Sequence, residues 1–305
     1  MSIYVSMTNE EQVGISAVER ETGLSKDTLR VWERRYGFPK PSRDGNGERA
    51  YPPDQVHLLR RIRRLMDQGA RPGRIFAMGV DVLEAKARDE APAPPPGGPP
   101  AEIELLRMHR IAELRSVLEQ GALRGGLYEF ITGTAAPLTA KVGEAWARGE
   151  LQVYEEHLFS EQLQAVLRGA IARLDGASAV PRVLLSTLPG EQHGLGLLMA
   201  QAVFALEGAG CVSLGTQTPV REIADAVHAE GAQIVALSTS GSYPAGQLKD
   251  GVAQLRAALP AGVELWCGGG GAAWLRQPAP GVRVLAGLER IRDALAAWRA
   301  ARAAA

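Results

Sequence analysis

The N-terminal arrangement is decided by residues 15–51, which read ISAVERETGLSKDTLRVWERRYGFPKPSRDGNGERAY. A short helical pattern covers Ile15 to Glu21, and Thr22-Gly23-Leu24 supplies a turn. Ser25 follows as a good N-cap, with Asp27 in the first turn of the next helix. The stretch therefore predicts two helices joined by a glycine turn.

The second helix is predicted to be basic on one side and apolar on the other. Lys26, Arg30 and Arg34 recur at intervals of four residues, while Leu29 and Trp32 are spaced to face a core. An Asp-Gly-Asn-Gly turn at residues 44–47 then joins two short strand-capable pieces, as in a β-hairpin wing. A further basic helix runs from Pro53 to about Gln68. This order of elements favours a DNA reader.

The charge distribution supports that interpretation. The chain of 305 residues has 34 basic and 34 acidic residues, yet residues 26–74 alone carry thirteen basic and six acidic ones, a local charge of +7. A polyanion would therefore contact the N-terminal part. The apolar content of 46%, without a long apolar run or a secretory leader at Met1 to Gln12, predicts packed domains in the cytoplasm and no membrane span.

Residues 29–39 (LRVWERRYGFP), followed by residues 47–51 (GERAY), resemble the MerR-type winged helix-turn-helix. The resemblance implies that double-stranded operator DNA is the partner, that the second helix enters the major groove and that the wing holds phosphates. The contacts that it implies are groove contacts from Lys26, Arg30 and Arg34, a backbone contact from Tyr36, and wing contacts from Arg43 and Arg49.

Two boundaries divide the chain. Residues 91–100 (APAPPPGGPP) can neither continue a helix nor bury a core, so they are interpreted as a semi-rigid linker. A softer boundary lies at residues 174–181, where a helical pattern gives way to a β-rich one. We therefore expect a DNA-binding domain over residues 1–90, a linker over 91–100, a four-helix bundle over 101–178 and an α/β domain over 179–305.

Strands and helices alternate in the last domain. Strand patterns lie at residues 182–187, 211–215, 233–238, 263–267 and 282–285, and helical patterns at 194–208, 220–230 and 245–259. The alternation predicts a parallel, doubly wound sheet of the Rossmann-like, flavodoxin-like kind, with ligands at the carboxyl ends of its strands. Cys211 and Cys267 fall in two strands as small hydrophobes, so neither a disulfide nor a zinc site is expected.

The loop after the first of these strands contains a histidine among glycines. Residues 188–196 read LPGEQHGLG, so His193 follows the carboxylate of Glu191 by two positions. A lone loop histidine is more often a surface residue than a metal ligand. Two features favour a ligand here: Glu191 can orient the imidazole, and the glycines at 268–271 leave a channel without side chains for a long ligand.

This loop resembles that of the cobalamin-binding domain, in which an Asp-or-Glu-x-His-x-x-Gly motif supplies the lower axial ligand of cobalt. The resemblance implies that His193 Nε2 ligates cobalt and that Glu191 fixes the ring through Nδ1. The motif and the residues that it places beside the nucleotide tail are Glu191, His193, Gly196, Ser238, Gly268 and Gly269.

Four helical patterns precede this domain, at residues 101–120, 127–133, 137–148 and 152–174, and predict a bundle whose core takes most of their apolar residues. Trp146, separated by nine residues from Glu156-His157, resembles the Trp-x9-Glu-His signature of the light-sensing CarH/LitR-type regulators. In that family these side chains cap the adenosyl group of adenosylcobalamin. With this signature the resemblance spans nearly the whole chain.

The resemblance implies a photochemical repressor. In that family adenosylcobalamin holds a DNA-binding tetramer in the dark, light breaks the cobalt–carbon bond, and the oligomer dissociates, which relieves repression. The physical basis is linkage, because a ligand drives assembly only through its preference for the assembled form. We expect a homo-oligomer here, either a dimer or a tetramer.

Four positions depart from the family pattern. Ala147 stands where a histidine becomes the second cobalt ligand after the adenosyl group has left. His157 has two interpretations: it replaces that ligand at the upper face, or it makes only a structural hydrogen bond from its helix. Gln192 and Gln217 replace an Arg and an Asp of the dimer contact, so an ion pair becomes at best an amide hydrogen bond. The usual Ser-x-Leu is Ser238-Thr239-Ser240, which keeps the hydroxyl of Ser238.

Two alternatives stay open beside the leading hypothesis. One is a regulator of the same architecture that works without cobalamin or light, which Ala147 and Gln192 favour and which His193 and Trp146 oppose. The other is a cobalamin-dependent mutase or methyl carrier, which would need a substrate-binding partner where this chain has a DNA reader. His57, His109 and His228 have no neighbouring motif and receive no role.

Overall fold

The computed structural model describes residues 12–45, 47–67, 71–77, 79, 100–174 and 179–303. Two compact units are formed, Met1–Gly98 with Glu144–Val153 and Pro99–Gly143 with Tyr154–Ala305. The linker predicted for residues 91–100 lies outside the described residues except for Pro100, and so do residues 175–178 of the second predicted boundary.

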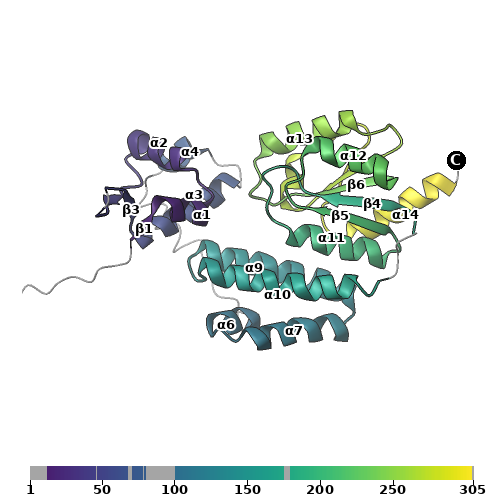
Figure 1. Ribbon diagram of the computed structural model, residues 1–305, viewed down its shortest axis with the longest axis horizontal. Coiled ribbons are helices and arrows are strands. Elements are labelled where there is room, and N and C mark those ends of the chain that lie inside the picture. Colours follow the sequence, from purple (N-terminus) through teal and green to yellow (C-terminus); the bar gives the residue numbers. More distant parts are fainter. Residues whose placement is uncertain are drawn as a thin grey trace, which may run out of the picture. The chain divides into compact units, whose positions relative to one another are not determined.

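The N-terminal unit is a small helical domain with a three-stranded antiparallel sheet (Figure 1). The sheet has the order β1-β3-β2. Its elements are β1 (Val13–Gly14), α1 (Ile15–Thr22), α2 (Lys26–Tyr36), β2 (Ser42–Arg43), β3 (Arg49–Tyr51), α3 (Pro53–Asp67) and α4 (Pro72–Ala77).

Local sequence signals explain the helix-turn-helix. The Ser25 hydroxyl accepts a hydrogen bond from the Thr28 backbone N–H at 3.1 Å and so begins α2. Gly23 and Gly37 end α1 and α2 in the left-handed conformation, with φ of 66° and 67°, which a glycine adopts without strain. Leu29 and Trp32 are buried as the helical spacing predicts, so the fold of this unit is confirmed.

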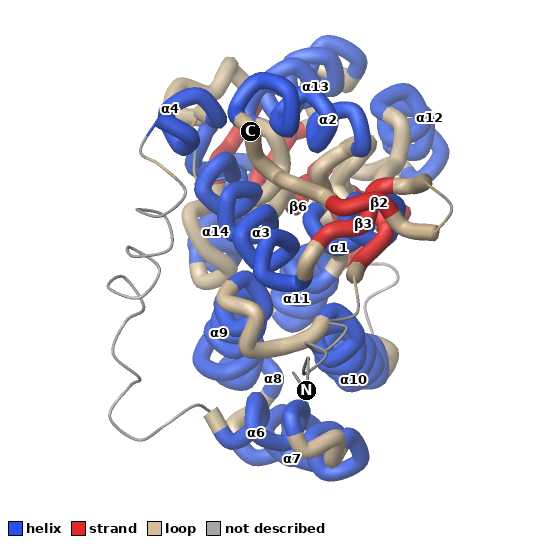
Figure 2. Tube along the Cα trace, turned by 90° about the vertical axis from the view of Figure 1, so that its left-hand side faces the viewer, coloured by secondary structure: helices blue, strands red, loops and turns tan. Residues whose placement is uncertain are grey.

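The second unit begins with a helical part, which lies beside α11 in both views (Figures 1 and 2). It contains α6 (Ala101–Arg107), α7 (Ile111–Arg124), α8 (Leu127–Glu129), a π-helical turn η1 (Phe130–Ala135), α9 (Ala136–Ala147) and α10 (Val153–Ile171). The last four residues of α9 and the first residue of α10 belong to the N-terminal unit.

Two predictions about these helices are wrong. The single helix expected over residues 101–120 is broken at His109, whose φ of 54° is left-handed. The break expected between Gly133 and Pro137 is absent, because Ala136 N–H donates to Ile131 O across the wider π-helical turn. That turn gives the Pro137 ring, which has no N–H to donate, a place within a continuous helix.

A parallel five-stranded sheet forms the rest of this unit. The strands are β4 (Arg182–Ser186), β5 (Gly210–Gly215), β6 (Ile234–Ser238), β7 (Glu264–Gly268) and β8 (Val282–Val284), in the order β5-β4-β6-β7-β8. In Figure 1, α12 (Val220–Glu230) and α13 (Ala245–Ala258) cover one face, and α11 (Leu195–Leu206) and α14 (Arg290–Ala303) lie on the other.

The flavodoxin-like doubly wound sheet is therefore confirmed. Its first and third strands, β4 and β6, are neighbours, so the strand order reverses between them. Ligands of such sheets bind where the order reverses, outside the carboxyl ends of the strands. The loop after β4, which carries His193, and the loop after β6, which begins at Thr239, both lie at this point.

Candidate functional site

The basic side chains of α2 lie on the exposed side of the helix. The Arg30 side chain is 47% exposed and donates to Asp27 at 3.1 Å, while Lys26 lies 3.9 Å from Glu19. Arg34 is exposed as well. Exposed ion pairs of this kind contribute little to stability, so these side chains can exchange their carboxylate partners for phosphates or bases.

A partly exposed ion pair joins the wing to the recognition helix. Arg49 Nε of β3 donates to Glu33 Oε2 of α2 at 2.7 Å, and this hydrogen bond raises the pKa of the guanidinium. Arg43 closes the wing turn by donating to the Gly47 carbonyl at 2.6 Å. A groove lined by Arg30, Glu33, Arg34 and Arg49 separates helix from wing.

Tyr36, the predicted backbone contact, is held by an aromatic partner. Its ring stacks on Phe76 of α4 with centroids 4.3 Å apart, and the Arg35 guanidinium lies 5.4 Å from the Tyr36 centroid on α2. Sequence reasoning missed Phe76, because its helix is short and no motif marks it. Val31, 49% exposed in the middle of α2, is a further exposed residue that it missed.

Glu191 organises the loop after β4. Its side chain is 1% exposed, whereas the His193 side chain is 66% exposed. Glu191 Oε1 accepts from the His193 backbone N–H at 2.9 Å and lies 2.6 Å from His193 Nδ1. Glu191 Oε2 accepts from the Ser240 backbone N–H and hydroxyl, both at 2.7 Å. One buried carboxylate thus joins the loops after β4 and β6 and orients the imidazole.

The Glu191 carboxylate is ionised despite its burial. Burial, the largest influence, raises the pKa of Glu191, but the hydrogen bonds from the His193 side chain and backbone and from Ser240 together hold its pKa below the ordinary value. A carboxylate that accepts from Nδ1 leaves Nε2 as the nitrogen with the ligating lone pair in a neutral imidazole.

Hydroxyl groups brace the same loop from both ends. Thr187 Oγ1 donates to the Glu191 carbonyl at 2.7 Å and accepts from Gln217 N–H at 2.8 Å, and Tyr243 donates to the Pro189 carbonyl at 2.8 Å. The sequence motif contains Ser240 but predicts no role for it. A polar residue two positions beyond a buried strand end was the signal for it.

Glycines at the carboxyl ends of the strands let the loops after β6 and β7 pack closely, so the open channel predicted at residues 268–271 is filled by backbone of residues 239–241. A Cβ on Gly196 would lie 2.9 Å from Ser238 Oγ, and Ser238 itself is buried on β6. A Cβ on Gly269, whose φ is 87°, would stand 2.3 Å from the Thr239 carbonyl oxygen. Gly268 follows the last buried residues of β7. An oriented, accessible imidazole at the carboxyl ends of the strands fits the axial metal ligand of a large cofactor.

The three residues of the predicted cap fall into different units. Trp146 belongs to the N-terminal unit, and the Arg60 Cζ of α3 lies 5.6 Å from the centroid of its ring. Glu156 and His157 belong to the second unit, where Glu156 accepts from Ser160 at 2.7 Å and the His157 side chain is 70% exposed. Ala147, beside Trp146, is 8% exposed.

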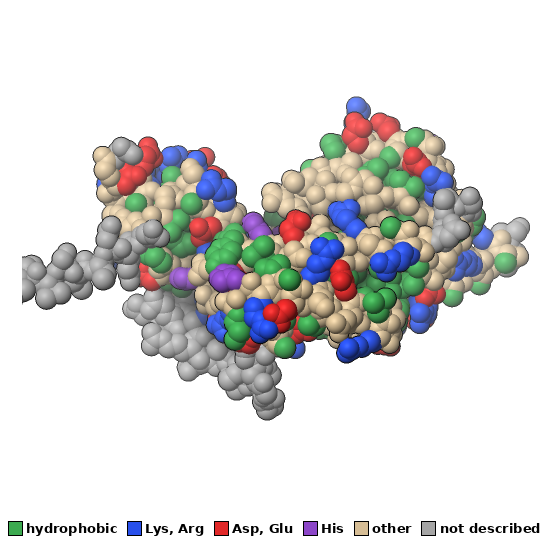
Figure 3. Space-filling view, turned by 60° about the horizontal axis from the view of Figure 1, so that its bottom comes forward, with side chains coloured by type: hydrophobic (Ala, Val, Ile, Leu, Met, Phe, Trp, Pro, Cys, Tyr) green, Lys and Arg blue, Asp and Glu red, His purple; other side chains and the backbone are tan. Residues whose placement is uncertain are grey.

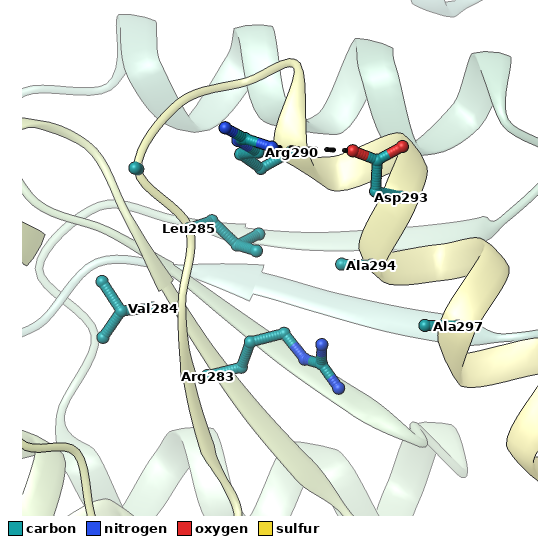
Figure 4. Close-up of a pocket in the computed structure, with 8 residues that line it drawn as sticks. Arg283, Val284, Leu285, Arg290, Asp293, Ala294 and Ala297 are labelled. Carbon is teal, nitrogen blue, oxygen red and sulfur yellow. Dashed lines mark ion pairs between the residues drawn. The ribbon is translucent and has the colours of Figure 1, made fainter.

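A shallow groove lies between β8 and α14 (Figure 4). Figure 4 shows Arg283 and Leu285 on one wall and Ala294 and Ala297 on the other, with Arg290 3.9 Å from Asp293 at one end. Neither cysteine contributes to this groove or to the histidine loop. Burial raises the pKa of Cys211 and of Cys267 to about 12, which keeps both thiols protonated and unreactive.

Other features of the described residues carry less information. Figure 3 shows basic and acidic side chains interspersed on the visible face of the helical part, so no field of one sign covers it. No group of three or more His, Cys, Asp or Glu side chains in the described ranges could hold a metal ion. Within those ranges, no helix combines the length and apolar character that a bilayer crossing needs.

Comparisons with known proteins agree with this geometry. Residues 14–76 match the family described as MerR HTH family regulatory protein, and residues 104–169 match the family described as B12 binding domain. The fold of the second unit is similar to that of the monomethylamine corrinoid protein of Methanosarcina barkeri, with 14% identity and a TM-score of 0.50 over 64% of this chain and 94% of that chain.

Two relatives from Myxococcus xanthus match along most of their length. The HTH-type transcriptional repressor CarH is 30% identical over 86% of this chain and 90% of its own, and the HTH-type transcriptional repressor CarA is 32% identical over 73% and 75%. This chain belongs to the CarH and CarA family of MerR-type transcriptional repressors.

Proposed function

We propose that this chain is a cobalamin-binding, light-responsive repressor that holds operator DNA as a homo-oligomer and acts in the cytoplasm. The family membership, the exposed basic helix α2 and the oriented imidazole of His193 support this function. The observation that carries the proposal is the network from Ser240 through Glu191 to His193 Nδ1. A loop histidine on the surface has no need of a buried, ionised carboxylate to fix its tautomer.

Different residues would bind different parts of the cofactor. His193 Nε2 would ligate cobalt from below, and Glu191 would keep the ring in the tautomer that can do so. The nucleotide tail would lie beside Gly196, Ser238, Gly268 and Gly269, and the cap would be formed by Trp146, Glu156 and His157. When bound, adenosylcobalamin supplies a cobalt–carbon bond that visible light cleaves.

In the proposed response to light, the chain itself changes its self-association. Residues of the cap hold the helical part in one arrangement in darkness, and their release after illumination lowers the affinity of the copies for one another. Several recognition helices in one assembly raise the effective concentration of each at a repeated operator. Dissociation therefore weakens DNA binding without any change in α2 itself.

An absorption experiment tests the proposal. The full chain is mixed with adenosylcobalamin in darkness, desalted, and measured before and after green light, with sizing chromatography and an operator gel shift on each sample. We expect retained cofactor, a spectral change on illumination, a smaller species and weaker DNA binding. A chain that retains no cobalamin refutes the cofactor site.

Two variants separate the modules. His193→Ala should lower cobalamin retention by about tenfold or more, since second-sphere losses alone cost that much at metal sites. Arg30→Ala, the matched control, should weaken the gel shift and leave the cofactor spectrum unchanged. Loss of cofactor in the Arg30 variant would show that the modules are assigned wrongly.

A second candidate is a regulator of the same architecture that responds to neither cobalamin nor light. Ala147 favours it, because the upper ligand that the family uses after illumination is absent. Gel shifts in light and dark, with and without cofactor, distinguish the two candidates. DNA binding that is equal in all four samples supports this second candidate.

A further inference from the structure

The end of α9 packs against the DNA-binding domain. Residues Glu144–Val153 belong to the same compact unit as α1 to α4. Gly149, with a φ of 75°, approaches α3 so closely that a Cβ there would stand 2.3 Å from His57 Nδ1. Leu151, two residues later, is fully buried. We name residues 146–151 the α9 tail, and its neighbours on α3 are His57 and Arg60.

Arg60 is the centre of this contact. It is 4% exposed, donates from Nη2 to Glu21 Oε2 at 2.6 Å, and has an Nε that makes no hydrogen bond. Its guanidinium Cζ lies 5.6 Å from the centroid of the Trp146 ring. A cation that has lost its water interacts more strongly with an indole face than an exposed one does. The Trp146 ring thus contacts the buried Arg60 guanidinium, which also donates a hydrogen bond to Glu21.

The same tryptophan has a second partner under the proposed function, on which this inference rests. The cap needs the Trp146 ring together with Glu156 and His157, whereas in the N-terminal unit the same ring lies against the Arg60 guanidinium. A cofactor that takes up the Trp146 ring would compete with Arg60 for the same indole.

We propose that Trp146 is shared: the α9 tail docks on Arg60 and His57 of the DNA-binding domain when the cofactor site is empty, and cofactor binding withdraws it. The docked state lowers the apparent cofactor affinity by the fraction of molecules in which Trp146 is engaged. Reciprocity requires that the cofactor weaken the docking by the same factor. The occupancy of the cofactor site is thereby communicated to α3, which packs against α1 of the helix-turn-helix.

Cofactor titrations test the sharing. Arg60→Gln removes the charge from the Trp146 ring and keeps an amide for Glu21, so adenosylcobalamin in darkness should bind about three- to tenfold more tightly than to the natural chain. Glu21→Gln, the matched control, removes the ion pair and keeps the Arg60–Trp146 contact, so its affinity should stay within about twofold of the natural value. Equal or weaker binding by Arg60→Gln overturns the proposal.

A second variant acts from the other side of the contact. Gly149→Ala places a methyl group against the His57 ring and strains the backbone at a φ of 75°, which destabilises the docked tail, so it should also tighten cofactor binding. Circular dichroism and the operator gel shift verify that both variants are folded. Tightening in Arg60→Gln but not in Gly149→Ala would also overturn a shared docking surface.

Hydrogen–deuterium exchange gives a readout that needs no cofactor activity. In the cofactor-free chain, amides of residues 144–153 should exchange faster in Arg60→Gln than in the natural chain. Adding adenosylcobalamin in darkness to the natural chain should speed exchange in residues 54–63. A natural chain that binds no cobalamin refutes the proposed function, whereas unchanged exchange in cofactor-free Arg60→Gln refutes the docking alone.

Discussion

Glu191 positions the His193 imidazole through hydrogen bonds and need not contact a ligand itself. All four of its hydrogen-bond donors come from His193 and Ser240, and three of these bonds are 2.7 Å or shorter. The Glu-x-His spacing allowed the first partner to be predicted from the sequence. The second partner could not be predicted, because it depends on which two loops the strand order brings together.

Replacement of Glu191 should therefore cost stability as well as affinity. In Glu191→Gln an amide nitrogen must face donors, so we expect the free energy of unfolding at pH 7 to fall by about 1–3 kcal/mol. Urea denaturation followed by the far-ultraviolet signal of the second unit measures the loss. Ser242→Ala, which leaves both Glu191 loops bonded, should cost less.

The pH dependence of this loss has a definite sign. Because the pKa of Glu191 is lower in the folded chain than in the unfolded chain, its ionised form stabilises the fold above the unfolded pKa. That contribution disappears as the pH falls through the folded pKa. The difference between the natural chain and Glu191→Gln should therefore shrink below about pH 4. A difference that grows on acidification contradicts the assignment.

Gly269 is the second residue on which the site depends. A Cβ at its φ of 87° would collide with the Thr239 carbonyl oxygen, so Gly269→Ala should destabilise the second unit by about 2 kcal/mol or more and weaken cobalamin retention. The matched control is Gly246→Ala in α13, where nothing lies within 4 Å and alanine should stabilise the helix by about 0.5–1 kcal/mol. Thermal unfolding measures both changes.

At the scale of elements, the wing and the recognition helix act as one body. The Arg49–Glu33 ion pair crosses from β3 to α2, with side chains that are 24% and 34% exposed. The sequence predicted both elements and their basic residues. It did not predict that one of the wing arginines, Arg49, is bonded to the recognition helix, since pairing across elements depends on their packing.

The Arg49–Glu33 ion pair can be tested with a variant for which simple electrostatics and loss of the ion pair predict opposite effects on DNA binding. Glu33→Gln removes a negative charge near DNA, and electrostatics alone predicts tighter binding. We expect operator affinity to fall by about three- to tenfold instead, because the wing loses its fixed position. Glu48→Gln removes the same charge from an exposed wing residue and should leave binding equal or tighter. Gel shifts at two salt concentrations compare them.

The helical part shows where local patterns mislead. His109 adopts a left-handed conformation that a non-glycine residue rarely takes, and nothing in the flanking residues signals a break there. Pro137 signals a break that does not occur, because the wider π-helical turn before it accommodates a residue that has no N–H to donate. By contrast, the five strands and their three intervening helices follow from alternation alone, whereas the 3₁₀ helix η2 (Gly270–Trp274) and the final helix α14 were not predicted.

At the scale of the whole molecule, the proposed self-association is the property that sequence differences from the family affect most directly. Gln192 and Gln217 occupy the two positions at which the family resemblance implies an ion pair between copies. Gln217 also has a φ of 60°, a conformation that Asp accepts more readily than Gln. Both features favour weaker assembly in this chain than in relatives that keep the charged pair.

Restoring the pair should strengthen assembly. The double variant Gln192→Arg/Gln217→Asp, loaded with adenosylcobalamin in darkness, should lower the dissociation constant of the oligomer several-fold relative to the natural chain, because opposite charges meet across the interface. Analytical ultracentrifugation measures it. The like-charge variant Gln192→Glu/Gln217→Asp should weaken assembly. Equal behaviour of the two double variants would show that these positions do not face each other.

The ligation of cobalt by His193 is tested most directly by electron paramagnetic resonance of the chain loaded with cob(II)alamin. The chain is prepared once with natural histidine and once with ¹⁵N-histidine, and His193→Ala is prepared in both forms. The account predicts that the nitrogen splitting changes from a triplet to a doublet with the label, in the natural chain alone. A splitting that is the same with and without the label would contradict it, because the axial nitrogen would then belong to the cofactor.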